Sequence, residues 1–333
     1  MIRLFTFSIF FIFSFFLYAE DSRYELGKGI QIGTLPLYIG GYLSLEYEHI
    51  DSENYSLKLD DIAILAYGNY NSLSYMIELE AEDIYTDIKS NERYIKDNQV
   101  HIERLYFTYE FNENYALSMG KYNSPIGFWN LVPINVLRDT TSSPIISKLL
   151  FPNFTSGLDV AYSSQDDTQY NVHLMIQERE DIDNWINDEI YNNFELNRHY
   201  GLGIGLEDNS VSYQFNMGYF RTVTDESHYY LLGAFQYLHP KFKLLAEIGT
   251  QFDDDGTNIP YIAYFQWSQK LEENHEVIFR AESYKDNQTD IEDNFLLLGY
   301  TYRPLAPVAF KAEYQLHSLH EENILLFSVS VLF

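Results

Sequence analysis

Cysteine is absent from the 333-residue chain. Its absence excludes disulfide bonds, thiolate metal sites and a lipid-modified N-terminal cysteine, so stability must come from packing and backbone hydrogen bonds. Basic residues are also scarce, with 21 Lys and Arg against 49 Asp and Glu and a formal net charge of −28. A chain this acidic repels phosphate backbones, which argues against nucleic acid as a partner.

Long hydrophobic runs are almost absent too. One largely apolar stretch, residues 4–18, follows the single charge of Arg3 and stops at Ala19, just before Glu20 and Asp21. A membrane-spanning helix needs about 20 apolar residues, whereas this layout is typical of a secretory signal peptide. We therefore expect residues 1–19 to be a signal peptide that is cleaved near Ala19. No comparable run follows, so the sequence predicts no membrane-spanning helix in the mature chain.

Aromatic residues, by contrast, are abundant: 30 Tyr, 24 Phe and 3 Trp make up 17% of the chain. An acidic chain with few aromatic residues would be expected to stay disordered, but this content suits β-strands and membrane interfaces. No linker rich in Pro, Gly or Ser and no shift of composition divides residues 20–333. We expect them to form a single domain.

The dominant pattern has a period of two. In residues 211–219, for example, large apolar residues alternate with small or polar ones, which predicts strands with one apolar face. About sixteen such segments are expected, near residues 37–48, 56–67, 72–83, 100–111, 115–122, 156–163, 168–178, 199–207, 210–221, 228–238, 241–252, 260–269, 274–284, 294–303, 307–317 and 323–333.

The connections between these segments alternate between short and long. Gaps such as 68–71, 112–114 and 208–209 are short, whereas the three longest are 84–99, 123–155 and 179–198. Outer-membrane barrels have short periplasmic turns and longer external loops. The sequence thus predicts a transmembrane, antiparallel, up-and-down β-barrel, all-β, with 16 strands. In a barrel Glu78, Glu80 and Glu82 would face the interior, although a solvated face of a soluble sheet would also explain these three residues.

The final segment carries a specific signal. Leu325, Phe327, Val329, Val331 and Phe333 form an apolar row that ends at the last residue of the chain. This row resembles the C-terminal signal that outer-membrane barrels present to their assembly machinery, which is therefore an expected partner together with outer-membrane lipid. An ordinary amphipathic strand is the alternative interpretation.

A second resemblance lies in the middle of the chain. Residues 119–130 read Met-Gly-Lys-Tyr-Asn-Ser-Pro-Ile-Gly-Phe-Trp-Asn, after Glu-Arg-Leu-Tyr-Phe at 103–107 and before Gly-Leu-Asp-Val at 157–160. A strand that ends in Gly-Lys-aromatic and runs into Pro-x-Gly resembles the phosphate-selective porin O and P group and related porins. The resemblance implies a 16-stranded barrel, often trimeric, whose long third external loop folds inward to narrow the channel.

The segmentation independently places the longest loop, residues 123–155, third. Its only charged residues are Arg138, Asp139 and Lys148, which makes them the candidates for a constriction.

Strand parity predicts which other charges face the pore. The inward set has nine acids and four bases: Glu46, Glu78, Glu80, Glu82, Glu110, Glu247, Glu276, Glu282 and Glu313 with Arg104, Lys243, Arg280 and Lys311. Because phosphate-selective members line their channel with basic side chains, phosphate selectivity does not carry over to this chain. Carboxylates around a pore favour cations, so the expectation is a modest cation preference.

Catalytic and metal motifs are missing from the sequence. It contains no Gly-rich phosphate loop, Gly-x-Ser-x-Gly elbow or His-Glu-x-x-His motif, so no enzyme, metal or cofactor is expected. His317 and His320 are interpreted as solvated loop residues, with a metal site as the alternative. The expected function is passive diffusion of small hydrophilic solutes or ions across a bacterial outer membrane. A barrel-embedded enzyme, and a plugged structural or adhesive barrel, remain open.

Overall fold

A computed structural model describes residues 24–50, 55–88, 93–94, 100–187, 193–254, 256–318 and 323–333. The predicted signal peptide, residues 1–19, lies outside this described part of the chain. Within the described part, no helix is both long enough and apolar enough to cross a membrane.

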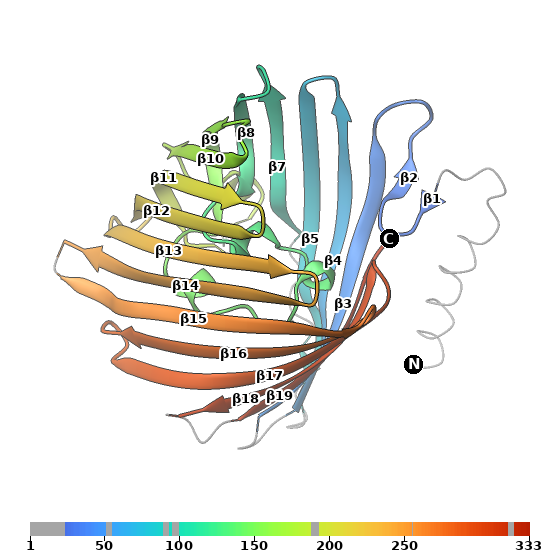
Figure 1. The fold of residues 1–333 in the computed structure, drawn as a ribbon, viewed down its shortest axis with the longest axis vertical. Coiled ribbons are helices and arrows are strands. Elements are labelled where there is room, and N and C mark those ends of the chain that lie inside the picture. The colour runs from blue at the N-terminus through green and yellow to red at the C-terminus, as the bar shows by residue number, and fades with distance from the viewer. Residues whose placement is uncertain are drawn as a thin grey trace.

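Sixteen long antiparallel strands form a closed barrel (Figure 1). They are β3 (Tyr38–Ile50), β4 (Tyr55–Tyr70), β5 (Leu73–Ile88), β7 (Val100–Glu110), β8 (Tyr115–Asn123), β9 (Phe154–Ser163), β10 (Thr168–Gln177), β11 (Leu196–Asp208), β12 (Val211–Thr222), β13 (Ser227–His239), β14 (Phe242–Asp253), β15 (Thr257–Glu272), β16 (His275–Asp286), β17 (Ile291–Leu305), β18 (Val308–His317) and β19 (Ile324–Leu332). Each predicted segment corresponds to one of them, so the predicted architecture and strand number are confirmed.

The remaining elements are short. They are β1 (Tyr24–Glu25), β2 (Gly29–Gln31), β6 (Arg93–Tyr94), the 3-10 helices η1 (Trp129–Leu131), η2 (Asn135–Leu137) and η3 (Ile182–Trp185), and the one-turn helix α2 (Ile146–Leu149). η1, η2 and α2 all belong to the long connection between β8 and β9.

The barrel closes where the last long strand pairs with the first. β19 runs antiparallel to β3, with Phe327 opposite Tyr47 and Val331 opposite Leu43. Closure satisfies the backbone groups of both strands, which would otherwise form an exposed sheet edge.

Apolar and polar side chains are distributed inside out relative to a soluble protein. On β18, Phe310, Tyr314 and Leu316 are 43%, 37% and 48% exposed, whereas Lys311 and Glu313 between them are 3% and 2% exposed. Neighbouring strands repeat the pattern, as Leu296, Leu298 and Tyr300 on β17 show. An apolar exterior around a polar interior is the arrangement that a barrel surrounded by lipid requires.

Bulges interrupt the strict alternation in two places that bear on the interior. The register of β4 shifts between Leu59 and Asp61, and that of β5 with β7 shifts between Glu78 and Leu79. An extra residue in one strand changes which face the following side chains occupy. As a result Glu103 and Arg104, which are neighbours on β7, are both buried, and the prediction from parity, which turned only Arg104 inward, is corrected by the addition of Glu103.

Candidate functional site

The connection between β8 and β9, residues 124–153, packs against the barrel wall. Ile134 and Val136 share one buried cluster with Tyr42 of β3, Ala63 of β4 and Ala309 of β18. Further apolar side chains of the segment, including Ile126, Trp129, Ile146, Leu150 and Phe151, share a buried cluster with Leu232, Leu245, Ile262 and other residues of β10 to β15. Those wall residues alternate along their strands with the exposed apolar ones, so they point to the interior.

A wall carboxylate holds the start of this segment. Glu247 of β14 accepts hydrogen bonds from the backbone N–H groups of Phe128 (2.6 Å) and Trp129 (3.1 Å). Gly127 makes the approach possible because its φ is +66° and because a Cβ there would lie 2.8 Å from the Glu247 carboxylate. The Pro-x-Gly motif noted in the sequence is therefore a turn shaped around Glu247.

Two further wall carboxylates repeat this contact along the segment. Glu313 of β18 accepts from the N–H groups of Thr141 and Ser142 and from the Ser142 hydroxyl. Glu282 of β16 accepts from the N–H of Ile145 at 2.8 Å. Backbone donors thus replace water around these buried carboxylates, which would otherwise be costly to desolvate.

Wall bases contact the same segment through its carbonyl groups. Lys311 Nζ donates to the backbone oxygens of Asn135 and Thr140, and Arg303 donates to those of Val136 and Arg138. Arg303 was not among the charged residues that strand parity predicted to face the interior.

The predicted constriction residue Asp139 lies within these contacts. Its carboxylate is 2.6 Å from Lys243 Nζ and accepts hydrogen bonds from Gln266 and Ser268, and its backbone oxygen accepts from Thr301. Asp139 therefore fastens the segment to β14, β15 and β17.

The predicted pore-lining charges divide into groups. Six of them contact residues 124–153, namely Glu247, Glu282, Glu313, Lys243, Lys311 and Arg280. Glu276 lies half-buried near Asp139 and Lys243. Arg104 pairs with Glu78, which also accepts from the Tyr42 hydroxyl. Glu110 is exposed at the short-turn end of β7, and the side chain of Glu82 lies outside the described part of the structure.

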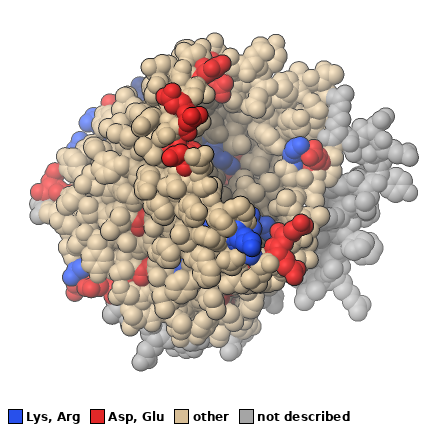
Figure 2. Space-filling view, in the orientation of Figure 1, with Lys and Arg blue, Asp and Glu red and all other residues tan. Residues whose placement is uncertain are grey.

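A cavity of about 430 Å³ lies between the segment and wall residues of β3 to β7 and β16 to β19. Six acids line it from β3, β4, β5 and β7: Glu46, Glu48, Asp60, Asp61, Glu80 and Glu103. Its four bases are Lys58, Arg138, Lys148 and Arg280, two of which belong to the segment itself. Figure 2 shows a recess in one face of the molecule with acidic and basic groups around it.

The basic side of the cavity is built around Trp129. The guanidinium of Arg280 lies 5.5 Å from the centre of the indole ring and that of Arg138 lies 6.0 Å from it. Arg138 also donates to the backbone oxygen of Val132 (2.8 Å) and to Ser143. Burial lowers the pKa of Arg138 and of Lys148, while Asp61 and Glu282 respectively favour the charged forms.

The acidic side contains residues that parity alone does not predict. Asp60 and Asp61 both line the cavity although they are neighbours on β4, because the bulge at this point turns both inward. Glu103 joins them through the second bulge. Two adjacent acids on a strand flanked by apolar alternation are the sequence signal that points to such a bulge.

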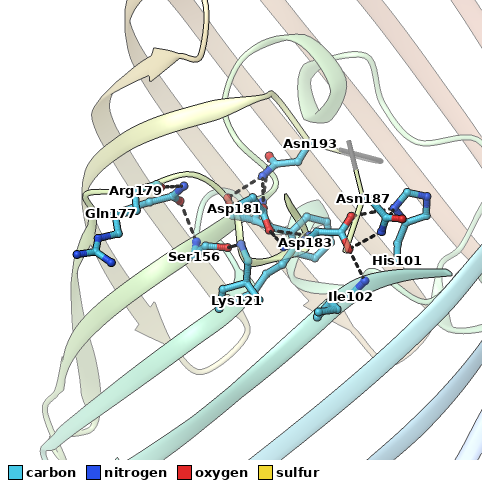
Figure 3. Close-up of polar contacts among 12 residues, drawn as sticks. His101, Ile102, Lys121, Ser156, Gln177, Arg179, Asp181, Asp183, Asn187 and Asn193 are labelled. Carbon is cyan, nitrogen blue, oxygen red and sulfur yellow. Dashed lines mark hydrogen bonds and ion pairs between the residues drawn. The ribbon is translucent and has the colours of Figure 1, made fainter. Parts of the chain in front are cut away.

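In the next long connection, residues 181–187 and Asn193 belong to a second buried network (Figure 3). Lys121 at the end of β8, 1% exposed, lies 3.2 Å from Asp181, and its Nζ is 5.3 Å from the centre of the Phe154 ring. The lysine of the Gly-Lys-aromatic motif is thus a structural anchor and not a residue of the cavity.

Asp183 completes that network. It accepts a hydrogen bond from the Ile102 N–H at 2.7 Å and lies 2.8 Å from His101 Nδ1 (Figure 3). Burial would raise its pKa, but the contacts with His101 and Ile102 hold the pKa of Asp183 below its ordinary value. Since β8 pairs with β7 only from Leu105 onward, Asp183 supplies an acceptor to a part of β7 that β8 does not reach.

The described histidines provide little support for a catalytic or metal site. His199 is fully buried between the hydroxyls of Thr155 and Tyr230, each 2.9 Å away. The interpretation of His317 as a solvated loop residue is wrong: it ends β18, is partly buried and lies 2.7 Å from Asp293. His320 is outside the described residues. Among the residues that are described, no cluster of three or more metal-ligating side chains is present.

Comparison with known proteins gives a match of fold only. No protein-family model matches the sequence, and no curated protein matches it. Among solved structures, OmpT of Vibrio cholerae superposes with a TM-score of 0.64 at 11% identity, covering 93% of this chain and 100% of that one. OmpF of Salmonella typhi gives 0.65 at 9% identity, with coverages of 89% and 97%.

An anion-selective porin from Comamonas acidovorans is also similar, with a TM-score of 0.60 at 10% identity and coverages of 89% and 99%. These similarities show that the chain has the fold of bacterial outer-membrane porins. They do not support the phosphate-selective group in particular.

Proposed function

We propose that this protein is a porin of a bacterial outer membrane that lets small hydrophilic solutes and ions diffuse passively through its barrel. The observation that carries the proposal is a closed barrel whose apolar exterior surrounds a charged cavity. Lipid stabilises such an exterior, and a cavity lined by ten charged side chains stays hydrated because its charges would be costly to dehydrate.

We infer that residues 124–153 lie in the bore and narrow it, as the resemblance to porins implies. The contacts with Glu247, Glu282, Glu313 and Lys311 support this. Glu247, Glu313 and Lys311 each lie next to an exposed apolar residue of their strand, and Glu282 continues the buried row of Ile278 and Arg280. The narrowest part of the pore is then bounded by this segment on one side and by β3 to β7 on the other.

We also propose a modest cation preference. Six acids face four bases around the cavity, while Glu247, Glu282 and Glu313 are occupied by backbone donors of residues 124–153. At about 0.15 M salt each charge acts over roughly 8 Å, so the preference should strengthen as salt falls.

Planar bilayers that separate unequal KCl concentrations test both statements. Purified protein should add stepwise current, with a reversal potential of the sign set by K⁺ permeation. A membrane that stays ion-tight would contradict the pore. Stepwise current with Cl⁻ selectivity would contradict only the cation preference, and would indicate that Arg138 and Lys148 dominate the narrowest part.

We propose that residues 1–19 direct export and that residues 20–333 reach the outer membrane through the barrel assembly machinery. A homotrimer is a further proposal: one of the similar solved structures is described as the trimer form of the Vibrio cholerae protein, with a TM-score of 0.60 at 12% identity and coverages of 89% and 99%. An enzyme and a plugged structural or adhesive barrel are the competing functions. Among the described residues no serine hydroxyl is hydrogen-bonded to a histidine, which leaves an enzyme without the pair that serine hydrolysis uses.

A further inference from the structure

An open groove of about 570 Å³ lies at the end of β10 to β12 that is opposite the short turns. The connection after β10 contributes Arg179 and Trp185 to its lining, and β11 and β12 contribute Arg198 and Arg221. None of these residues lines the cavity described above. The groove is therefore a separate feature that the proposed pore does not use.

The groove opens on the outward face of the barrel wall. Arg198 and Arg221 lie opposite each other on β11 and β12, and the residues that follow and precede them on these strands are fully buried. Tyr200 and Tyr219 form the next outward pair, with ring centres 6.0 Å apart. Tyrosines on the outward face mark the boundary between hydrocarbon and lipid headgroups. Both arginines consequently lie at the level of the headgroups.

The three arginines of the groove retain free hydrogen-bond donors. Arg198 lies 3.8 Å from Glu178 and Arg221 lies 3.2 Å from Asp225, and exposed ion pairs of this kind contribute little. In the described part of the chain no carboxylate pairs with Arg179, whose guanidinium points away from the buried network (Figure 3). A guanidinium carries five N–H donors and binds phosphate in a bidentate manner. Three such groups together, in a chain with 21 basic and 49 acidic residues, favour an anionic ligand.

Trp185 adds an apolar contact surface that the fold holds in place. It is 77% exposed, more than any other large hydrophobic side chain among the described residues. It ends η3, whose first turn is fixed by the buried contacts of Asp181 and Asp183. An aromatic ring fixed in advance stacks on the apolar face of a sugar ring at little cost in entropy. The neighbouring carboxylates of Glu178 and Glu180 are acceptors for sugar hydroxyls.

We propose that this groove binds the phosphorylated sugar headgroup of a glycolipid in the outer leaflet of the membrane. The phosphate binds Arg179, Arg198 and Arg221. A sugar ring stacks on Trp185, and the acyl chains extend along the apolar wall below the stacked tyrosines. The proposal rests on the outer-membrane location and not on conduction, so a barrel that does not conduct would carry the site as well.

Binding of lipid A to the purified, detergent-solubilised protein tests this proposal. Lipid A is a diphosphorylated glucosamine disaccharide with acyl chains, and titration followed by native mass spectrometry gives its apparent affinity. The wild-type protein should bind lipid A roughly tenfold more tightly than the fully dephosphorylated lipid, the ratio that loss of one charge-assisted hydrogen bond produces.

Variants separate the groove from the rest of the wall. Arg198→Gln with Arg221→Gln should weaken lipid A binding roughly tenfold, close to the affinity of the dephosphorylated lipid. Trp185→Ala changes a loop residue and should weaken the binding of both lipids, and it decides the question if the arginine variant does not fold. Lys285→Gln is the control, because Lys285 lies at the same end of the barrel, pairs with Glu292 and is absent from the groove. Its affinity should equal that of the wild type.

Equal affinity of the wild type for lipid A and for its dephosphorylated form, or unchanged affinity in the folded groove variants, would overturn the site. A soluble glucosamine phosphate that binds as tightly as lipid A would overturn the lipid source and would assign the groove to a dissolved sugar phosphate. Neither result bears on conduction, which the planar bilayer experiment measures separately.

Discussion

Removal of residues 138–148 should raise single-channel conductance roughly twofold or more, since a wider minimum cross-section admits more ions. These residues carry Arg138, Asp139 and Lys148, and they include the amides of Thr141 and Ser142 that Glu313 holds. If residues 124–153 lie in the bore as proposed, the deletion removes much of the material that narrows it. Single-channel recording in planar bilayers measures the effect.

The control is a second loop deletion, which removes the tip of the β12–β13 hairpin, residues 223–226. The side chains of this tip are exposed, and its backbone contacts are those of its own turn and the Val223 N–H donated to Glu195 O. Its loss should therefore leave conductance unchanged. If both deletions give wild-type conductance in folded protein, the constriction lies elsewhere in the barrel. Heat-modifiable mobility on gels establishes that each variant is folded.

Deletion of Phe333 should sharply reduce the amount of folded barrel in the outer membrane. The Phe333 N–H donates to Gly41 O at 2.7 Å, and its carbonyl oxygen accepts from Gly41 N at 2.8 Å. These two bonds extend the β19–β3 seam that closes the barrel, and together they contribute about 2 kcal/mol. The same deletion removes the end of the apolar row of Phe327, Val329 and Val331, the proposed assembly signal.

Phe333→Tyr is the control, because it retains both backbone bonds and the aromatic ring. Membrane fractionation and heat-modifiable mobility compare the three proteins. A deletion variant that reaches the outer membrane in wild-type yield would show that Phe333 is an ordinary final residue.

The wild-type sample also tests the predicted export. The mature chain should begin near Glu20, and a full-length chain in the inner membrane would contradict the signal peptide.

The fold was predictable because its dominant pattern is local. Apolar and charged residues alternate along consecutive positions, as in Phe310, Lys311, Ala312, Glu313 and Tyr314. Lipid outside the barrel and water inside it impose this alternation on each of the sixteen strands. Turn lengths then gave the order of short and long connections. The same segmentation predicted that the longest loop is the third external loop in chain order.

The site was only partly predictable, because its geometry depends on contacts between distant residues. Parity placed Glu247 and Glu313 on the face opposite the apolar residues of their strands, but no local pattern shows that each would bind an amide of residues 124–153, more than a hundred positions away in sequence. Bulges added Asp60 and Glu103 to the cavity. The Gly-Lys-aromatic motif suggested a pore family, yet Lys121 anchors a different loop through Asp181.

The distinction between wall charges that face the cavity and those that hold the loop is the main change from the sequence-based picture. A count of nine inward acids and four inward bases treats all of them as equivalent. In the structure Glu46, Glu80 and Arg280 line the cavity, and Glu46 and Arg280 also bond to Asn135 and Thr140 of the loop. Glu247, Glu313 and Lys311 contact backbone groups of residues 124–153 and are absent from the lining.

The most direct test of an open, narrowed pore is liposome swelling with sugars of increasing size. Liposomes that contain the purified, folded protein should swell rapidly in a monosaccharide, more slowly in a disaccharide and not at all in a large dextran. This gradation is expected because a hydrated cavity bounded by residues 124–153 admits small solutes and excludes large ones. Liposomes that swell in none of these sugars would show that the barrel is plugged, and would contradict the proposed function.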